Sequence, residues 1–586
     1  MVFYSYLKKR TQSNHYYLSL EEKSMLLRFK RSIVVSLVVL GLSLLMVQSA
    51  WSYGHGDTKY SGFKNVIIMI PDGCDETVQT VARWYKGEDL QVDKMDGGGV
   101  KVHMANSVIP GSAAAATAFA TGHKTTVRFL GVGPRTTDLL TGFTPTAEPY
   151  APVASVIEAA KAAGKSTGIV STSRVTHATP AAFACHIQDR GMDNEIMEHM
   201  VYNNINVVFG GGARHLIPSG NTYTTTFGAE WGGKRTDGED LMQVLLDRGY
   251  RFVDNKDDMA ELTSGNVWGL FDDSHMQPDM DRQHFATHEP SLAEMTSKAI
   301  ELLAQNDNGF CLMVEGSQVD WAGHANDPVY MTRDFIAFDD AVKAACDFAD
   351  QNPGTLVLAY PDHNTGGMKI GHYYTAMGYT ETTIEDLVDP LKGMTITAGG
   401  LTRMMGSDTS VANIIATISL YWNIVIDETE AQEILDYDEE TGAGLSYSIS
   451  HVISKNHTAI GWTTHGHNGE TVPLWVYGAD APAGIIDNTE LALMAADAIG
   501  VDLAATTSDL YVDAATAITG TFQLDKTDPE NPVLKAGVSE IPMSKDTMKF
   551  TGWDWEIELP GLAVYAPETD TVYISEKAAW IINLFN

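Results

Sequence analysis

Three short apolar runs, each followed within three residues by an acidic residue, constrain the fold of this 586-residue chain more than any other feature. Unbroken apolar runs of this length suit strands that are buried on both faces of a parallel sheet. The runs and their acids are, in chain order, Val66–Ile70 before Asp72, Cys311–Val314 before Glu315, and Leu356–Ala359 before Asp362. The chain is therefore predicted to build a sheet with acids at the ends of its central strands.

Helical patterns separate these runs. The segment Ala154–Ala163 places its apolar residues on one side and stops at Gly164, and Leu292–Leu303 does the same with Ser291 as its cap. Alternation of strand and helix predicts an α/β domain with a large, mostly parallel central sheet flanked by helices. In such sheets ligands gather at the carboxyl ends of the strands, which is where the acids fall.

Residues 1–52 are predicted to be a secretory signal peptide. Basic residues precede the apolar run Ile33–Val47, and small residues suited to a cleavage site occur at Ala50 and Ser52. The run is short for a membrane-spanning helix, and an uncleaved anchor is the alternative. We expect a periplasmic or secreted protein with no stable membrane association after signal cleavage.

The rest of the chain divides into a main domain and two less regular parts. Residues 53–520 are predicted to form the main domain, because this stretch holds the strand and helix patterns. From about 368 to 460 no clear buried strand returns, which indicates an inserted region over or beside the site. Residues 521–586 alternate apolar and polar side chains, as in Val572–Ile574, and predict a β-rich appendage of unknown role.

The four cysteines have no metal-binding spacing and form no CxxC pair. Cys311 falls in a predicted strand and Cys346 on an apolar helix face, so both are predicted to be buried thiols. Cys74 lies close to Asp72, and whether any cysteines pair is left open. Export permits disulfides, but a chain of this length does not need them.

The net charge of −36 at pH 7 limits the possible partners. A surface of this sign repels nucleic acid and anionic lipid, so we expect neither to bind. An anionic substrate would also be repelled unless its site carries local positive charge. Bound metal ions and an arginine can provide that charge.

Eight side chains form a candidate metal-binding set. Carboxylate oxygens and imidazole nitrogens in this mixture suit zinc with a magnesium neighbour, without any thiolate. An isolated acid or histidine is more often a surface charge, a helix cap or a satisfied core residue, but several clusters that each follow a strand are hard to explain by coincidence. The set is Asp72, Thr179, Glu315, Asp320, His324, Asp362, His363 and His467.

Ser112 stands at the beginning of an alanine-rich segment that ends at Gly122. Alanine favours helix, so Ser112 is predicted at the amino end of one. The alternative to a functional role is that Ser112 is an ordinary N-cap serine. A helix start also favours a bound phosphate or an alkoxide, and a metal ion can hold a serine hydroxyl deprotonated. Together with the metal-binding set, Ser112 indicates metal-assisted phosphoryl transfer.

Six sequence blocks, in the same order, resemble those of the alkaline phosphatases. The similarity spans roughly residues 62–505 and is specific because separate blocks agree, whereas the final eighty or so residues are not covered. The blocks are IIMIPDGCDE, GSAAAATAFATGHKT, TSRVTHATPAAFACHIQDR, FCLMVEGSQVDWAGHANDP, LVLAYPDHNTGG and WTTHGHNGETVP.

The resemblance implies two zinc ions and one magnesium ion. Asp320, His324 and His467 match the ligands of one zinc. Asp72, Asp362 and His363 match those of the second zinc. Asp72 is also expected to reach towards magnesium together with Thr179 and Glu315.

The resemblance also implies the catalytic roles. Ser112 matches the nucleophile that is transiently phosphorylated, and Arg190 matches the arginine that clamps the phosphate. A planar guanidinium can bind two phosphate oxygens at once, which a lysine cannot do equally well. Arg190 as a surface ion pair is the alternative.

Four positions depart from the family pattern or complicate it. Gly111 stands where many members carry an aspartate that holds the arginine, and Trp321 stands where others have lysine or histidine. His177 replaces an aspartate of other members and is expected beside the magnesium site. His465 lies two residues from His467 and could compete for its role, although the sequence context favours His467.

We therefore expect an exported alkaline phosphatase that hydrolyses phosphate monoesters through a phosphoserine at Ser112. The resemblance also implies a homodimer. A phosphodiesterase or a sulfatase on the same scaffold is one alternative. A non-enzymatic exported metal-binding protein is the other, and the presence of both Ser112 and Arg190 argues against it.

Overall fold

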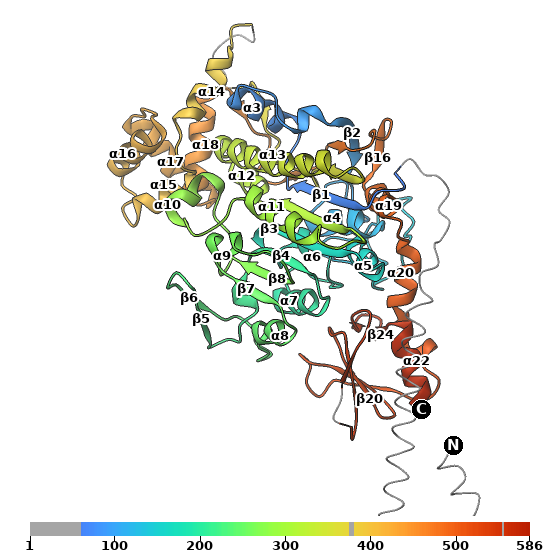
Figure 1. Cartoon of the computed structure of the whole chain (residues 1–586). Helices are drawn as coiled ribbons and strands as arrows, with labels where there is room; N and C mark the ends of the chain where they lie inside the picture. The colour runs from blue at the N-terminus through green and yellow to red at the C-terminus, as the bar shows by residue number, and fades with distance from the viewer. Residues whose placement is uncertain (1–59, 374–379, 554–555, 586) are drawn as a thin grey trace, which may run out of the picture. The chain divides into compact units, whose positions relative to one another are not determined.

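The computed structural model describes residues 60–373, 380–553 and 556–585, and these belong to one compact unit. The predicted signal peptide, residues 1–52, lies outside the described residues. Figure 1 shows the helices and strands by label, coloured along the chain.

A ten-stranded sheet forms the centre of the unit, in the order β16-β2-β15-β10-β1-β9-β3-β4-β8-β7. Six consecutive pairs from β10 to β7 are parallel, as is β16 with β2, and only β15 runs antiparallel to its neighbours. The prediction of a large, mostly parallel sheet is confirmed. The strands are β1 (Asn65–Pro71), β2 (Asp96–Lys101), β3 (Ser166–Arg174), β4 (Val207–Gly211), β7 (Arg251–Val253), β8 (Val267–Leu270), β9 (Phe310–Gly316), β10 (Thr355–Ala359), β15 (Val472–Tyr477) and β16 (Ile485–Asp487).

The three predicted apolar runs are the central strands β1, β9 and β10, and every residue in them is buried. Successive side chains of a strand point to opposite faces. Accordingly Ile68 of β1 joins one hydrophobic cluster, and its neighbours Ile67 and Met69 join another on the opposite face. Because both faces are covered by helices, these strands need apolar residues at every position.

Helices cover each face of the sheet. One face carries α4 (Ser112–Thr121), α5 (Val156–Ala162), α6 (Ala178–Ala181), α7 (Asp193–Tyr202), α8 (Leu241–Asp247), α19 (Asn488–Ile499) and α20 (Leu503–Leu510). The other face carries α3 (Glu76–Lys86), α9 (Lys256–Ala260), α10 (Asp279–Phe285), α11 (Leu292–Leu303), α12 (Gln318–Ala325) and α13 (Pro328–Gln351). Short elements between them are η1 (Val92–Lys94), η2 (Ala213–His215), β5 (Thr222–Thr224) and β6 (Glu230–Gly232).

Local capping explains the ends of the predicted helices. Ser291 closes a capping box with Glu294 at the start of α11, and that helix has the predicted bounds. Ser155 does the same for α5, and Gly164 beyond its end has a positive φ of 74°. Gly122 follows α4 with φ 80°, as predicted.

The predicted insertion, about 368 to 460, consists mainly of five helices that pack on the second face. Trp422 of α16 and Ile453 of α18 are buried in the same hydrophobic cluster as the central strands. The domain boundaries themselves stay a prediction. The helices are α14 (Ile384–Gly393), α15 (Ala398–Met405), α16 (Val411–Trp422), α17 (Glu428–Thr441) and α18 (Leu445–His457), and the flanking strands are β12 (Lys369–Ile370) and β13 (Ile460–Gly461).

Small antiparallel sheets form the carboxyl-terminal segment, around a hydrophobic cluster of their own. Asp546 there forms a salt bridge with Arg248 of the main domain, at 2.7 Å. The elements are β17 (Val512–Asp513), α21 (Ala514–Ala517), β18 (Gln523–Asp525), β19 (Val533–Ala536), β20 (Ser539–Pro542), β21 (Thr547–Phe550), β22 (Glu556–Glu558), β23 (Val564–Ala566), β24 (Thr571–Ile574) and α22 (Glu576–Phe585).

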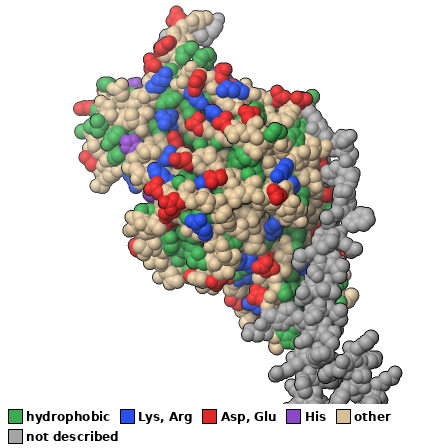
Figure 2. All heavy atoms as spheres, in the orientation of Figure 1, with side chains coloured by type: hydrophobic (Ala, Val, Ile, Leu, Met, Phe, Trp, Pro, Cys, Tyr) green, Lys and Arg blue, Asp and Glu red, His purple; other side chains and the backbone are tan. Residues whose placement is uncertain are grey.

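All four cysteines are free and buried, so the interpretation of Cys311 and Cys346 as buried thiols is confirmed. Among the described residues, no single helix is long and apolar enough to cross a membrane. By length and composition alone, only the pair α19 and α20, bent by 91°, would pass such a test. On the face drawn in Figure 2, acidic side chains are scattered among basic ones.

Candidate metal centre

The register of the central strands brings the predicted acids to one edge of the sheet. In β1 and β9, Ile70 pairs with Glu315, and in β1 and β10, Met69 pairs with Ala359. Asp72 and Asp362 follow within three residues of those pairs. Because the strands are parallel, their carboxyl ends and the acids beyond them meet at the same place.

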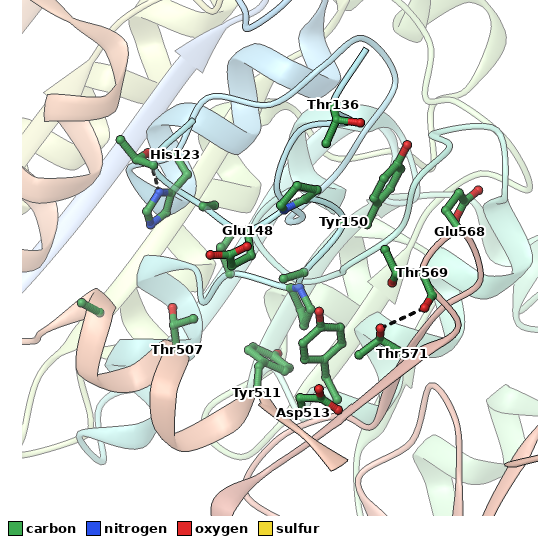
Figure 3. Close-up of a pocket in the computed structure, with 18 residues that line it drawn as sticks. His123, Thr136, Glu148, Tyr150, Thr507, Tyr511, Asp513, Glu568, Thr569 and Thr571 are labelled. Carbon is green, nitrogen blue, oxygen red and sulfur yellow. Dashed lines mark hydrogen bonds between the residues drawn. The ribbon is translucent and has the colours of Figure 1, made fainter. Parts of the chain in front are cut away.

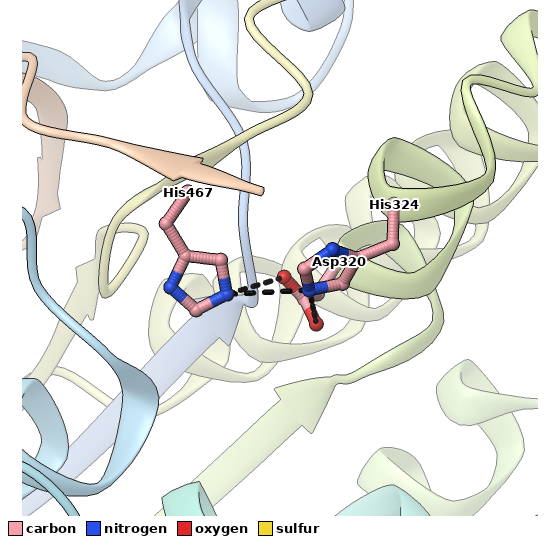
Figure 4. A group of neighbouring side chains, drawn as sticks. All are labelled: Asp320, His324 and His467. Atoms are coloured by element: carbon pink, nitrogen blue, oxygen red, sulfur yellow. Dashed lines mark hydrogen bonds and ion pairs between the residues drawn. The ribbon is translucent and has the colours of Figure 1, made fainter. Parts of the chain in front are cut away.

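Asp320, His324 and His467 form the first group, shown in Figure 4. Asp320 and His324 are four residues apart on α12 and therefore share one face of that helix. His467 comes from β14 (His467–Asn468), which pairs with β11 (Asn364–Thr365). The Nε2 atoms of the two histidines are 3.3 Å apart, and each lies 3.5–3.6 Å from an Asp320 oxygen.

Main-chain carbonyl groups orient both histidines of this group. Nδ1 of His467 donates to the carbonyl oxygen of Pro110 at 2.8 Å, and Nδ1 of His324 donates to that of His465. Both Nε2 atoms therefore point into the group as free ligands, an arrangement typical of metal-binding histidines. The His465 ring instead bonds the His324 carbonyl and the Tyr437 hydroxyl, at 2.8 and 3.1 Å. This arrangement favours His467 over His465 as a ligand.

Asp72, Asp362 and His363 form the second group, and all three are fully buried. Nε2 of His363 lies 3.0 Å from Asp362 Oδ2 and 3.7 Å from Asp72 Oδ1. The other Asp362 oxygen accepts from the main-chain N–H groups of Gly73 and His363. The rings of His363 and His467 stack at 3.8 Å, so the two groups are neighbours.

A third group joins Asp72 to Glu315 and His177. Glu315 Oε2 accepts from the Ser171 hydroxyl at 2.7 Å. Thr179 lies on α6, which packs against β9, and its hydroxyl is buried without a hydrogen-bond partner. The structure thus brings the predicted acids together and places a histidine where the sequence left its role open.

The unpaired oxygens of these groups fit divalent cations. Five buried oxygens have no hydrogen-bond partner, although a buried polar atom normally has one. Two of them instead lie within ion-pair distance of Nε2 of His363. Leaving such atoms unsatisfied costs about 1–3 kcal/mol each, and hard or borderline cations bind oxygen and imidazole donors of this kind. The oxygens are Asp72 Oδ1 and Oδ2, Thr179 Oγ1, Glu315 Oε1 and Asp362 Oδ2.

The pKa values report the same accumulation of negative charge. Burial, then Asp362 and other acids nearby, raises the pKa of Asp72 well above its ordinary value. Burial raises the pKa of Glu315 to about 7. Burial also acts to raise the pKa of Asp362, but the His363 imidazolium outweighs it and lowers this pKa to about 2. Burial and the neighbouring His363 lower the pKa of His467 to about 4, which keeps its ring neutral and able to bind metal.

We expect the stabilisation by bound metal to increase with pH. Without metal, folded Glu315 keeps a proton up to about pH 7 that the unfolded chain releases near 4.5. The unfolded state then binds fewer protons, so this group destabilises the metal-free protein as pH rises through that window. Metal binding needs the deprotonated ligand. The difference in Tm between metal-loaded and metal-free protein should widen by about 2–3 °C from pH 5 to pH 8, measured by calorimetry. A constant difference would contradict this account.

Ser112 is the first residue of α4, and the N-cap is Gly111 rather than Ser112. The simple N-cap alternative is therefore wrong. The Ser112 hydroxyl is buried and lies 3.2 Å from Nε2 of His363, beside the second group. Every residue of α4 is buried, which explains the run of alanines against α19 and α6. The helix start thus presents the Ser112 hydroxyl, hydrogen-bonded to His363, to the candidate metal centre.

Arg190 reaches the site from the segment after α6. Its NH2 group lies 2.8 Å from Nε2 of His177, and Asp72 and Asp320 are among the acids whose charges act on its pKa. Trp321 packs edge-on against His177, with 5.6 Å between ring centroids. No salt bridge to Arg190 occurs in the part of the chain that the structure describes. This agrees with the presence of Gly111 where many family members carry an aspartate that holds the arginine.

Sequence reasoning missed several supporting residues. The Thr365 hydroxyl donates to Asp320 at 2.6 Å, and the Ser171 hydroxyl supports Glu315. Gly73 has φ 76°, and a Cβ there would lie 2.7 Å from the main chain of Asp320. Thr365 stands two residues after His363, and this closeness in sequence could have identified it as a supporting residue. The contacts of Ser171 and Gly73 depend on segments more than 140 residues away and leave no local pattern.

Two other features do not qualify as the site. A further acidic group consists of Glu198, Asp237 and Glu239. Lys545 lies 2.6 Å from Glu239, so this group already has a positive charge beside it. A cavity of about 900 Å³, shown in Figure 3, is lined by residues such as Tyr150 and by no predicted site residue.

Known proteins similar to this chain are alkaline phosphatases. The alkaline phosphatase family model matches residues 63–501. Alkaline phosphatase 3 of Bacillus subtilis is 33% identical over 456 residues, covering 73% of this chain and 87% of that protein. The crystal structure of a cold-active alkaline phosphatase from Shewanella sp. has a TM-score of 0.60 and 26% identity, covering 73% and 98% of the two chains.

One more similar solved structure is described with a bound metal ion. A histidine-to-aspartate variant of the TAB5 alkaline phosphatase, described with Mg bound in its M3 site, has a TM-score of 0.53 and 23% identity. The match covers 76% of this chain and 99% of that one. At this identity, the likeness extends to the fold alone.

Proposed function

The chain belongs to the alkaline phosphatase family of metal-dependent phosphomonoesterases, and we propose that it hydrolyses phosphate monoesters through a phosphoserine at Ser112. The observation that carries the proposal is the buried Ser112 hydroxyl, 3.2 Å from His363, at a site where three groups of potential ligands meet. The buried oxygens of Asp72, Glu315 and Thr179, which have no hydrogen-bond partner, support magnesium as one of the ions.

We assign two zinc ions and one magnesium ion to the three groups. Asp320, His324 and His467 would hold one zinc, and Asp72, Asp362 and His363 the other. Asp72, Glu315 and Thr179 would hold magnesium, with His177 beside it. When bound, zinc supplies the positive charge that favours a deprotonated Ser112 and an anionic leaving oxygen.

The residues of the chain account for the two chemical steps. Ser112 Oγ, having lost its proton, forms a bond to phosphorus while the bond to the ester oxygen breaks, and that oxygen takes up a proton as the alcohol departs. A water molecule then attacks the phosphoserine, its oxygen bonds to phosphorus, and Ser112 recovers a proton as inorganic phosphate leaves. The N-terminal end of α4 offers main-chain N–H groups to the phosphate, and Arg190 binds its non-bridging oxygens.

We further propose that residues 1–52 direct export and that the protein acts as a homodimer in the periplasm or outside the cell. The charge pattern around the apolar run supports the first, and the family supports the second. Rates on a monoester, a diester and a sulfate ester, measured side by side, separate the proposed activity from a phosphodiesterase or sulfatase. Turnover of the diester or sulfate above that of the monoester would overturn the proposal.

Replacement of Arg190 by alanine should lower kcat/KM for a phosphate monoester by about 10²–10⁴-fold. Two charge-assisted hydrogen bonds are lost, each contributing about 1.5–3 kcal/mol. Arg190→Lys should recover only part of this, because an ammonium group cannot bind two oxygens in one plane. Inhibition by inorganic phosphate should weaken in parallel. Arg251→Ala, an exposed arginine on β7, is the matched control; full recovery in Arg190→Lys would contradict the two-oxygen clamp.

A further inference from the structure

A cavity of about 240 Å³ lies directly beside the candidate metal centre, between α12 and the helices of the predicted insertion. Trp321 and Ala325 on α12 line it, and these residues directly follow Asp320 and His324 in the sequence. The other walls come from α10, α15 and α18. The same helix therefore presents ligands on one face and lines the cavity with the next residues.

Two aromatic side chains join the cavity to the site. The Trp321 ring lies 5.6 Å from that of His177, which contacts Arg190. The Tyr447 ring lies 6.1 Å from that of His465, whose carbonyl oxygen orients His324. Burial raises the pKa of Tyr447, and the negative charge of Asp320 raises it further. Both aromatic rings thus line the cavity and lie next to side chains at the candidate metal centre.

The geometry of phosphoryl transfer points the leaving group towards this cavity. The attacking and departing oxygens lie on opposite sides of phosphorus in an in-line displacement. Ser112 stands beside His363, in the second group of ligands. The departing oxygen therefore belongs on the side of the first group, which α12 carries. The alcohol attached to that oxygen extends along α12, where the cavity begins.

The side chains that line the cavity include several aromatic rings and one cationic group. Phe285, Trp321 and Tyr447 are all partly exposed in it, and the guanidinium carbon of Arg403 lies 4.1 Å above the Phe285 ring. Among the described residues that line the cavity, Arg403 is the only lysine or arginine. Burial raises the pKa of Asp281, and the charge of Arg403 acts to lower it. Within the described chain it forms no salt bridge closer than 4 Å, and the hydrogen bond it donates goes to Gln277.

The two acids that line the cavity already accept hydrogen bonds from neighbouring residues. Asp281 accepts from the main chain and the hydroxyl of Thr397, at 2.9 and 2.6 Å. Asp327 accepts from the main chain of Tyr330 and of Ala398, at 3.1 and 2.8 Å. Both are buried and serve the fold. In a chain of net charge −36, an arginine without a salt bridge at this place is the unusual feature.

Resting on the proposed function, we propose that this cavity is the leaving-group subsite and takes a single aromatic ring that carries an anionic substituent. Its volume is below the 300–1,000 Å³ typical of pockets for larger ligands, so one ring fits better than an extended group. The ring packs against Phe285 and Tyr447, and the anionic substituent pairs with Arg403.

The first test compares benzyl phosphate with ethyl phosphate, whose leaving alcohols have similar acidity. The ratio of their kcat/KM values should favour benzyl phosphate in the unmodified enzyme. Phe285→Leu and Tyr447→Leu should each lower that ratio by about 3- to 10-fold, because an aromatic contact is lost. Phe227→Leu removes an exposed aromatic side chain outside the cavity and should leave the ratio unchanged.

The second test compares 4-carboxybenzyl phosphate with benzyl phosphate. Arg403→Gln should lower that ratio about tenfold, the loss of one charge-assisted pair. Lys392→Gln removes the same charge from an exposed position on α14 and should not change it. Unchanged ratios in all cavity variants would overturn the subsite, and a response to the aromatic variants alone would overturn the anionic substituent. If no monoester is hydrolysed by the unmodified enzyme, the proposed function fails instead.

Discussion

A Ser112→Ala variant should form no phosphoenzyme, and its kcat/KM for phosphate monoesters should fall by at least about 10⁴-fold, the scale seen when a nucleophile is removed. The hydroxyl is buried at the start of α4 and faces His363, and alanine removes only that oxygen. The helix should persist, because alanine favours it and Gly111 remains the N-cap.

Metal content separates the roles in this variant. Each of the three groups keeps all its carboxylate and imidazole ligands in this variant, so bound zinc and magnesium should remain nearly unchanged. Phosphoenzyme can be trapped by acid quench with radiolabelled substrate, and metals can be counted by mass spectrometry. Ser508→Ala, an exposed serine on α20, serves as the matched control. Substantial metal loss from Ser112→Ala would count against this division of roles.

Removal of zinc by a chelator should lower kcat by at least about 10³-fold, and added zinc with magnesium should restore it. The four acids of the centre then have no cation opposite them, and Arg190 alone cannot neutralise a phosphate and a leaving oxygen. The measurement is activity together with metal analysis on the same sample. Full activity after verified zinc removal would refute the mechanism.

Two neighbouring histidines provide the control for this experiment. His467→Ala removes an Nε2 atom that faces Asp320 and His324, and should lose about one zinc per chain with most of the activity. His465→Ala removes a ring whose two nitrogens are bonded to His324 and Tyr437, so its metal content should stay close to that of the unmodified protein. Loss of zinc from His465→Ala, with zinc retained in His467→Ala, would make His465 the ligand instead of His467.

The fold was largely predictable because its signals are local. A strand buried on both faces needs a run of apolar residues, which is why Val66–Ile70 and Leu356–Ala359 could be placed. A capping serine followed by glutamate marks a helix start, which is why α11 had the predicted bounds. The predicted insertion was harder to predict, since its described residues form five helices and contribute no strand to the central sheet.

The site was predictable only as a set of residues. Their types and their order matched the family, but the roles of the individual ligands stay a prediction until metals are measured. The contact of His177 with Arg190, and the N-cap position of Gly111, depend on geometry that the sequence does not state.

The sequence by itself determined where strands and helices form and which residues can perform the chemistry, because propensity, capping and apolar periodicity act between close neighbours along the chain. Only the tertiary structure decided that His467, rather than His465, faces Asp320, and that Arg403 and Tyr447 border a cavity beside Trp321. Those relations join segments from about 80 to more than 140 residues apart. They are set by how α12, α15 and α18 pack, which no local pattern records.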